Sequence, residues 1–194
     1  PAPTTKITYR SNEICVSPNI NTITIEPNTS CHAYFKEICK YNRVTPNIDP
    51  VALGEQKGYV EFSYPKRDTW FGSVDPKVIK KLALSQDVIT EFVEQKTIDD
   101  YFSQIGQKRT LIKIDTEGNE LAVLRGANRT LQENKPKIIF ESWNDTRRIE
   151  IFDFLHSKKY ILFHLPWNPA DNAQPLSYQQ FVKSSSINFM AIPT

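Results

Sequence analysis

The sequence is short of several residues and patterns, and each shortage excludes a class of protein. Only 6 of its 194 residues are glycine, and the first of these is Gly54. No apolar run approaches the roughly 18 residues that a membrane-spanning helix needs, so we expect no membrane span. The 24 basic residues barely exceed the 22 acidic ones, and a net charge of +2 lacks the basic excess of a dedicated nucleic-acid binder.

Cysteine is scarce as well, with Cys15, Cys31 and Cys39 in the whole chain. Cys31 and Cys39 lie on one expected helix, two turns apart, which is too far for a disulfide between them. No cysteine or histidine cluster has the spacing of a zinc site. We interpret the thiols as reduced and expect a cytoplasmic protein.

What is present suits one globular domain over residues 1–194. Hydrophobic residues make up 39% of the chain and aromatic ones 11%, which is ample for a core. The chain begins with Pro-Ala-Pro and not with Met. We therefore expect a domain of a longer protein, with the other domains of that chain among its partners.

Strands and helices are expected to alternate along most of the chain. Residues 1–21 show no sustained periodicity, but after them apolar residues recur at strand or helix spacing. Extended segments are predicted at 22–25, 45–53, 59–64, 87–98, 110–115, 137–141, 160–165 and 186–192, and helices at 30–42, 99–105, 120–134 and 145–158. This alternation predicts an α/β fold with a mostly parallel sheet and helices on both faces.

Three predicted strands end in an acidic residue, namely Glu26, Asp115 and Glu141. In open α/β sheets, ligands bind beyond the carboxyl ends of the strands, so these carboxylates are candidate site residues. A carboxylate at the end of the second strand can accept both hydrogen bonds of a ribose diol, which fits Glu26. Acidic residues here can also act simply as helix caps and first-turn acids.

The segment after the strand at 110–115 contains further acids, Glu117 and Glu120, around Gly118. Gly118 allows a tight turn or a close approach to a ligand. We interpret Glu120 as a first-turn acid that the helix dipole favours, and Asp115 as the better candidate for contact with substrate or cofactor.

Five segments of the chain form a recognisable pattern. The central one, at residues 111–141, reads LIKIDTEGNELAVLRGANRTLQENKPKIIFE. The others read TITIEPN at 22–28, VALGEQKG at 51–58, TIDDYF at 97–102 and INFMAIP at 187–193. Together these segments are similar to the FkbM-type S-adenosylmethionine-dependent methyltransferases, and the resemblance covers about residues 20–192.

This resemblance implies a Rossmann-like class I methyltransferase fold and O-methyl transfer to a sugar or polyketide hydroxyl. Glu26, with Asn28 in the same turn, would hold the ribose of S-adenosylmethionine, and the turn that starts at Asp49 would contact the adenine. Asp115 would lie beside the sulfonium and the acceptor, and Glu117 and Glu141 would line the acceptor pocket.

One part of the family pattern is not found. Family members begin with a strand and a glycine-rich turn, but no glycine precedes Gly54 here. We expect this first glycine-rich strand to be missing or degenerate. Either residues 9–14 (YRSNEI) are its remnant, or the strand lies before Pro1.

Methyl transfer to a sugar hydroxyl needs a base for the hydroxyl proton, and Asp115 or Glu141 would accept it. His164, at a strand end, is a further candidate. Arg67, Trp70 and Trp143 could hydrogen-bond and stack on a glycan or small-molecule acceptor, or could equally be loop residues packed on the core edge. Two carboxylates, Asp115 and Glu141, are too few to predict a metal.

Three functions compete on this pattern. The first is a sugar-directed O-methyltransferase with S-adenosylmethionine as cofactor, which the acids Asp115, Glu117 and Glu141 favour. The second is a methyltransferase-like module that binds glycans or acts as a scaffold without catalysis, which the missing glycine turn favours. The third is a domain that binds nucleoside-diphosphate sugars, but the chain has no glycine loop or basic cluster for phosphates.

Overall fold

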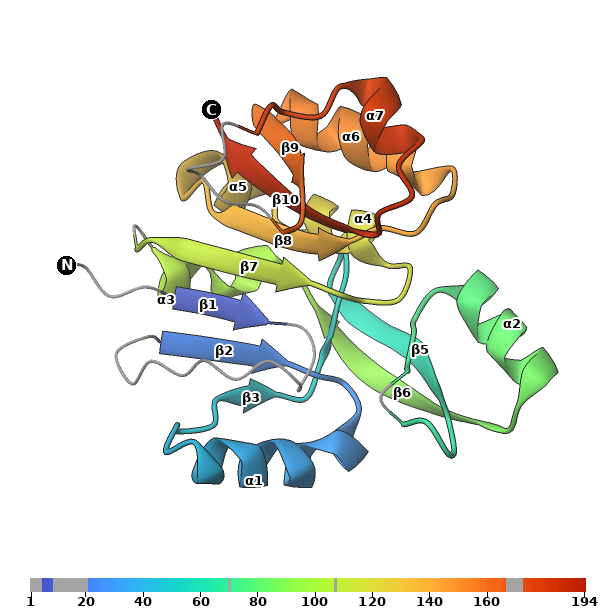
Figure 1. Cartoon of the computed structure of the whole chain (residues 1–194). Coiled ribbons are helices and arrows are strands. Elements are labelled where there is room, and N and C mark those ends of the chain that lie inside the picture. The colour runs from blue at the N-terminus through green and yellow to red at the C-terminus, as the bar shows by residue number, and fades with distance from the viewer. Residues whose placement is uncertain (1–4, 9–20, 70, 107, 167–172) are drawn as a thin grey trace.

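The fold is built on a seven-stranded sheet, seen in a computed structural model that describes residues 5–8 (backbone), 21–69, 71–106, 108–166 and 173–194. The strand order is β3-β2-β1-β7-β8-β10-β9 (Figure 1). The strands span Thr5–Thr8 (β1), Asn21–Ile25 (β2), Ile48–Asp49 (β3), Thr110–Ile114 (β7), Lys137–Glu141 (β8), Tyr160–His164 (β9) and Asn188–Pro193 (β10).

Pairing in this sheet is parallel except around β10. The last strand runs antiparallel to both β8 and β9, while the pairs on the other side of β8 are all parallel. Apart from Thr110, the buried residues of β7 and β8 are aliphatic or aromatic, as expected for strands that helices cover. The mostly parallel Rossmann-like sheet predicted from the sequence is confirmed.

The structure contains a first strand, β1, so the alternative that this strand is missing from the chain is wrong. β1 lies in the centre of the sheet, where Ile7 pairs with Ile23 of β2 and with Ile112 of β7. It precedes residues 9–14, which were considered its remnant and lie outside the described residues. The strand is therefore degenerate in sequence, with no glycine in or before it, but not missing.

Helices lie on both faces, as predicted. From β1 the chain adds β2 and β3 on one side of the sheet, and from β7 it adds β8, β10 and β9 on the other. Because the crossovers between parallel strands are right-handed, the helices of the two halves lie on opposite faces of the sheet. On one side, α1 (His32–Tyr41) buries Phe35 and Cys39. On the other, α4 (Glu120–Arg125), α5 (Asn128–Glu133) and α6 (Arg147–Ser157) cover β7 and β8 with apolar residues of the main core.

The helix predicted at 120–134 is in fact two helices, α4 and α5, which meet at Gly126 and Ala127. A Cβ on Gly126 would lie 2.0 Å from the carbonyl oxygen of Gly54. The two backbones therefore approach so closely that only glycine fits. This contact joins the segment after Leu53 to the α4–α5 turn.

A second, three-stranded sheet was not predicted as a separate unit. Its order is β4-β6-β5, with β5 and β6 antiparallel over eight residue pairs. The segment predicted at 45–53 is divided, because β3 joins the large sheet and β4 the small one. The strands span Ala52–Leu53 (β4), Gly58–Pro65 (β5) and Val88–Lys96 (β6).

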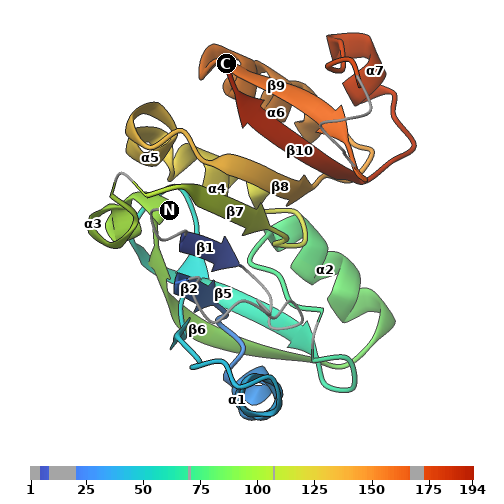
Figure 2. The same ribbon diagram turned by 60° about the vertical axis from the view of Figure 1, so that its left-hand side comes forward.

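Two helices of the structure, α2 and α7, were not predicted from the sequence, and the helix predicted at 99–105 is present as two short pieces. α2 (Pro76–Ser85) packs beside β5 (Figures 1 and 2), and α7 (Tyr178–Val182) packs on α6. The segment predicted at 99–105 forms a 3-10 turn, η2 (Ile98–Tyr101), followed by α3 (Phe102–Ile105). Asp75 caps α2 and Pro76 follows it, which is a local signal for a helix start.

Arg148 connects the carboxyl-terminal elements from inside the protein. Its side chain is fully buried, and its guanidinium donates hydrogen bonds to four backbone carbonyl oxygens. These belong to Ser142 after β8, to Phe181 and Ser184 at α7, and to Ser186 before β10, at 2.6–3.3 Å.

Two expectations about cysteine and the membrane can be compared with the described part of the chain. Cys31 and Cys39 are both free thiols, so the two do not bridge each other; Cys15 lies outside the described residues. Among the described helices, none combines the length and the apolar character needed to span a bilayer.

Candidate functional site

The carboxyl ends of the parallel strands gather acidic residues at one edge of the large sheet. Glu26 follows β2, Asp49 ends β3, Asp115 follows β7 and Glu141 ends β8. In Figure 1 the arrowheads of β1, β2, β7 and β8 all point toward the three-stranded sheet, so this edge lies between the two sheets. The strand order reverses between β1 and β7, which is the usual place for a ligand in such a fold.

Asp115, Glu117 and Glu141 form what we call the carboxylate cluster. One carboxylate oxygen of each lies within 4.8 Å of those of the other two. Asp115 and Glu117 are buried and Glu141 is half-buried, and Lys113 places its Nζ 3.3 Å from Oδ2 of Asp115. Carboxylates this close repel one another, and a bound cation among them would relieve this repulsion.

The cluster has two chemical capabilities. It can accept the proton of a hydroxyl group, and its three oxygen donors match the ligands of a hard divalent cation. From the sequence, Asp115 and Glu141 alone were too few ligands to predict a metal. The structure adds Glu117 as a third oxygen donor.

The turn that carries Glu117 is held from three directions. Glu117 (φ +49°) and Gly118 (φ +102°) both adopt positive φ. Oε1 of Glu120 accepts hydrogen bonds from the amides of Thr116 and Gly118 and from the Thr116 hydroxyl, at 2.9–3.1 Å. Burial raises the pKa of the Glu120 carboxyl. Glu120 lies in the first turn of α4, as predicted, and its carboxylate in addition closes the preceding turn through these hydrogen bonds.

The other two supports come from distant segments. The hydroxyl of Ser73 donates to the carbonyl oxygen of Glu117 at 2.8 Å, and Nη1 of Arg147 donates to that of Gly118 at 2.6 Å. Arg147 also contacts Asp75, the cap of α2, at 2.5 Å. The loop before α2, the turn after β7 and the start of α6 therefore meet at one place.

Glu26 and Asn28 lie together, but their side chains have different tasks. Oε1 of the buried Glu26 accepts a hydrogen bond from the Asn28 amide at 2.8 Å. The Asn28 side chain caps the 3-10 turn η1 (Thr29–Cys31) through the amide and hydroxyl of Ser30, and its amide group donates to the carbonyl of Thr69. Asn28 thus caps the 3-10 turn that precedes α1, where Thr29 or Ser30 was predicted as the cap of one continuous helix.

Asp49 is engaged by two neighbours. Its Oδ2 accepts from Nζ of Lys96 at 2.9 Å and from the hydroxyl of Tyr101 at 2.6 Å. The hydrogen bond to Asp49 raises the pKa of Lys96, and burial together with Asp49 raises that of Tyr101. The carboxylate named for cofactor contact is therefore already charge-paired.

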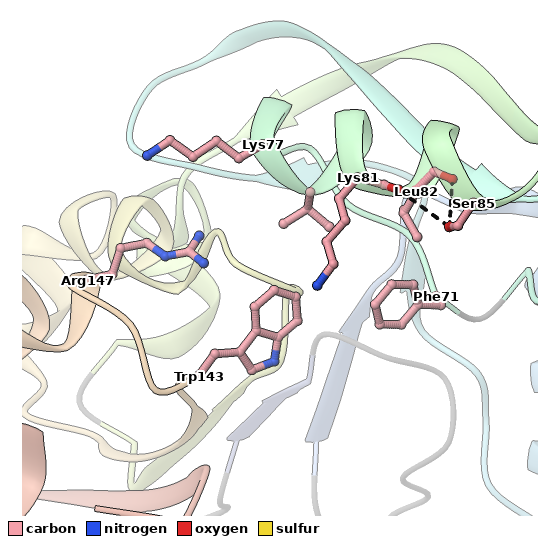
Figure 3. Close-up of a pocket in the computed structure, with 8 residues that line it drawn as sticks. Phe71, Lys77, Lys81, Leu82, Ser85, Trp143 and Arg147 are labelled. Atoms are coloured by element: carbon pink, nitrogen blue, oxygen red, sulfur yellow. Dashed lines mark hydrogen bonds between the residues drawn. The ribbon is translucent and has the colours of Figure 1, made fainter. Parts of the chain in front are cut away.

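A pocket of about 260 Å³ lies between α2, the loop before it and the segment after β8 (Figure 3). Trp143, a predicted acceptor residue, lines it. The other lining residues were not named from the sequence: Phe71, Lys77, Val78, Lys81, Leu82, Ser85 and Arg147. Finding them required the helix at 76–85, whose Asp75-Pro76 start was the available signal.

The other predicted acceptor residues are not brought to this pocket. Arg67 is exposed and lines a neighbouring pocket with Asp68 and Asp87. His164 is exposed at the end of β9, where β10 separates it from β8, and its ring packs 5.6 Å from that of Phe189. Trp70 lies outside the described residues.

Comparison with known proteins gives one family. The model of the methyltransferase FkbM domain matches residues 7–162. No curated protein matches the chain. Together with the sheet order, the family match confirms the expected class I methyltransferase fold.

Two solved structures are similar. The methyltransferase FkbM of Methylobacillus flagellatus KT is 18% identical, with a TM-score of 0.48, and the match covers 88% of this chain and 36% of that one. The precorrin-6y C5,15-methyltransferase of Geobacter metallireducens GS-15 is 10% identical, with a TM-score of 0.45, over 97% of this chain and 79% of that one. The chain thus spans about a third of the length of the Methylobacillus protein.

Proposed function

Because the chain belongs to the FkbM methyltransferase domain family, we propose that it transfers the methyl group of S-adenosylmethionine to a hydroxyl oxygen of a sugar or glycan. The carboxylate cluster carries this proposal. Asp115, Glu117 and Glu141 stand at the carboxyl edge of the sheet, next to a pocket with aromatic walls. S-adenosylmethionine would supply a methyl carbon that its sulfonium already activates.

Glu26 is the residue proposed to hold the ribose. It is presented at the carboxyl end of β2, and the Asn28 amide orients its carboxylate. Two oxygens on one carboxylate match the two hydroxyls of a ribose diol. Asn28 contributes by fixing this turn, and the Asp49 segment borders it through the hydrogen bond from the Glu26 amide to the Asp49 carbonyl.

The acceptor hydroxyl must lose its proton as the new C–O bond forms. Asp115 or Glu141 accepts this proton in the proposed mechanism, because each presents a carboxylate at a strand end within the cluster. The protein otherwise contributes mainly by holding donor and acceptor in line.

A second function, glycan binding or scaffolding without catalysis, is favoured by a specific observation. No glycine precedes Gly54, so the sequence has no glycine-rich turn of the kind that lets a backbone approach a cofactor closely. Such a module would keep the pocket but bind no cofactor.

Calorimetric titration with S-adenosylmethionine and S-adenosylhomocysteine separates the two functions. We expect saturable 1:1 binding, weakened at least tenfold by Glu26→Gln and unchanged by Glu37→Gln, an exposed glutamate on α1. Absence of binding at millimolar cofactor would reject the enzyme and favour the binding module.

Methyl transfer to a panel of simple glycosides tests the base. We expect Asp115→Asn to lower kcat by roughly 10²–10⁴-fold, with Asp153→Asn on the exposed side of α6 as control. Unchanged transfer by Asp115→Asn would show that Asp115 is not the base.

A further inference from the structure

The pocket lined by Trp143 borders the carboxylate cluster through three separate connections. Trp143 follows Glu141 by two residues, so the pocket begins where β8 ends. Arg147, another lining residue, donates to the Gly118 carbonyl in the turn that carries Glu117. Phe71 precedes Ser73, which donates to the carbonyl of Glu117. A molecule in this pocket would therefore lie beside the proposed reaction centre.

The walls of the pocket are apolar and aromatic. Phe71 and Trp143 contribute rings, and the buried Val78 and Leu82 contribute aliphatic surface from α2. Figure 3 shows Lys81 extending from α2 toward Trp143 and Phe71. Lys81 is an exposed residue, and its ammonium group is directed toward a surface whose four side chains offer it no hydrogen-bond acceptor.

The charges around the pocket are unevenly compensated. Arg147 forms two ion pairs, from Nη1 to Oδ2 of Asp75 and from Nη2 to Oδ2 of Asp145, each at 2.5 Å. Within the described part of the chain, Lys77 and Lys81 form no ion pair, and no acidic residue lines the pocket. In Figure 3, Lys77 points away past Arg147, whereas Lys81 is directed at the aromatic wall. The guanidinium of Arg147 also lies 5.8 Å from the centre of the Trp143 ring, but it is already paired with Asp75 and Asp145, so Lys81 is the cation without an ion pair at this wall among the described residues.

We propose that this pocket recognises an anionic substituent on the acceptor, the carboxylate of a uronic acid or the phosphate of a phosphorylated sugar. Lys81 would pair with the anion while Trp143 packs against the apolar face of the sugar ring. A volume of about 260 Å³ is below that of a typical drug-sized ligand site and suits a single ring. The inference rests on the proposed function, because it names the class of acceptor for that same site.

Matched probes test the charge preference directly. Binding of methyl glucuronide, glucose 6-phosphate and the neutral methyl glucoside would be measured by titration, monitoring the indole N–H signal of Trp143 by NMR. We expect one or both charged probes to bind roughly fivefold to tenfold more tightly than the neutral one, with the gain reduced by added salt. Which charged probe binds better distinguishes a uronic acid from a phosphorylated sugar.

Two adjacent lysines supply the variants. Lys81→Gln should abolish the preference, whereas Lys80→Gln, exposed on the same helix and not among the lining residues, should retain it. Equal affinity for charged and neutral probes, no detectable binding of the charged ones, or equal losses in both variants would overturn the inference. Titration of S-adenosylmethionine into the same proteins is a separate readout, so failure of the enzymatic function is distinguishable from failure of the charge preference.

Discussion

Asp115 and Glu120 show how two nearby carboxylates acquire different roles from their surroundings. Glu120 accepts three hydrogen bonds within its own turn, which occupies its side chain in shaping the backbone. Asp115 stands at the strand end, in the carboxylate cluster and beside Lys113. The first is a structural residue and the second is directed toward the site, although both are buried acids within six positions.

Replacing Glu120 with Gln tests the cost of its buried charge. Burial raises the pKa of Glu120 above its ordinary value of 4.5, so the folded protein retains this proton to a higher pH than the unfolded chain does. The stability of the parent relative to Glu120→Gln should therefore fall as the pH rises through and above 4.5. Urea unfolding of both proteins at pH 4 and pH 7.5 measures this difference. If the free energy of unfolding of the parent instead rose relative to that of the variant with increasing pH, the hydrogen bonds to the Glu120 carboxylate would outweigh the cost of burying its charge.

At the scale of elements, α4 and α5 illustrate how a long-range contact divides a helical pattern. Leu121, Leu124, Ala127 and Leu131 have the spacing of one continuous helix. Gly126 lies against the Gly54 carbonyl, and that contact fixes where the first helix ends. The break is therefore decided by a residue more than 70 positions away in the chain.

Gly126→Ala should destabilise the protein even though alanine is the better helix former by about 1 kcal/mol. The added Cβ would lie 2.0 Å from a backbone oxygen that cannot rotate away, and we expect a loss of about 1–3 kcal/mol. Thermal and urea unfolding measure it, with Gln132→Ala on the exposed side of α5 as control, expected within about 0.5 kcal/mol of the parent. A stabilised Gly126→Ala would contradict the close packing of the two backbones.

At the scale of the molecule, two arginines join segments that are distant in sequence. Arg147 links the start of α6 to the turn after β7 and to the cap of α2, which ties the small sheet and its helix to the site. Arg148 points the other way and holds β8, α7 and β10 together through backbone carbonyls. Two adjacent arginines thus bind the segment after Glu141 to different parts of the fold: Arg147 to the site and α2, and Arg148 to the carboxyl-terminal elements.

Arg148→Met should be among the most damaging single changes in the protein. It leaves buried carbonyl oxygens without their donors, each at a cost of about 1–3 kcal/mol, so we expect a total loss above about 3 kcal/mol. Arg129→Met, on the exposed surface of α5, should cost about 1 kcal/mol or less. A Tm for Arg148→Met close to that of the control would show that the carbonyls find other donors.

The sequence by itself determined the parts of this protein that depend on neighbouring residues. The β-branched and aliphatic segments at 110–115 and 137–141 predicted β7 and β8 closely, because burial on both faces of a sheet requires such residues. The placement of Asp115 and Glu141 at strand ends followed directly, since parallel strands end at one edge. The family followed from the same segments.

Only the tertiary structure decided the rest. Thr5–Thr8 has little local pattern and becomes a strand because β2 and β7 offer hydrogen-bonding partners on both of its sides. The candidate acceptor pocket joins residues 71–85 to residues 143–147, and no local periodicity can reveal a surface shared by segments so far apart. Local propensity specifies elements, whereas the closeness of distant side chains depends on how the whole chain packs.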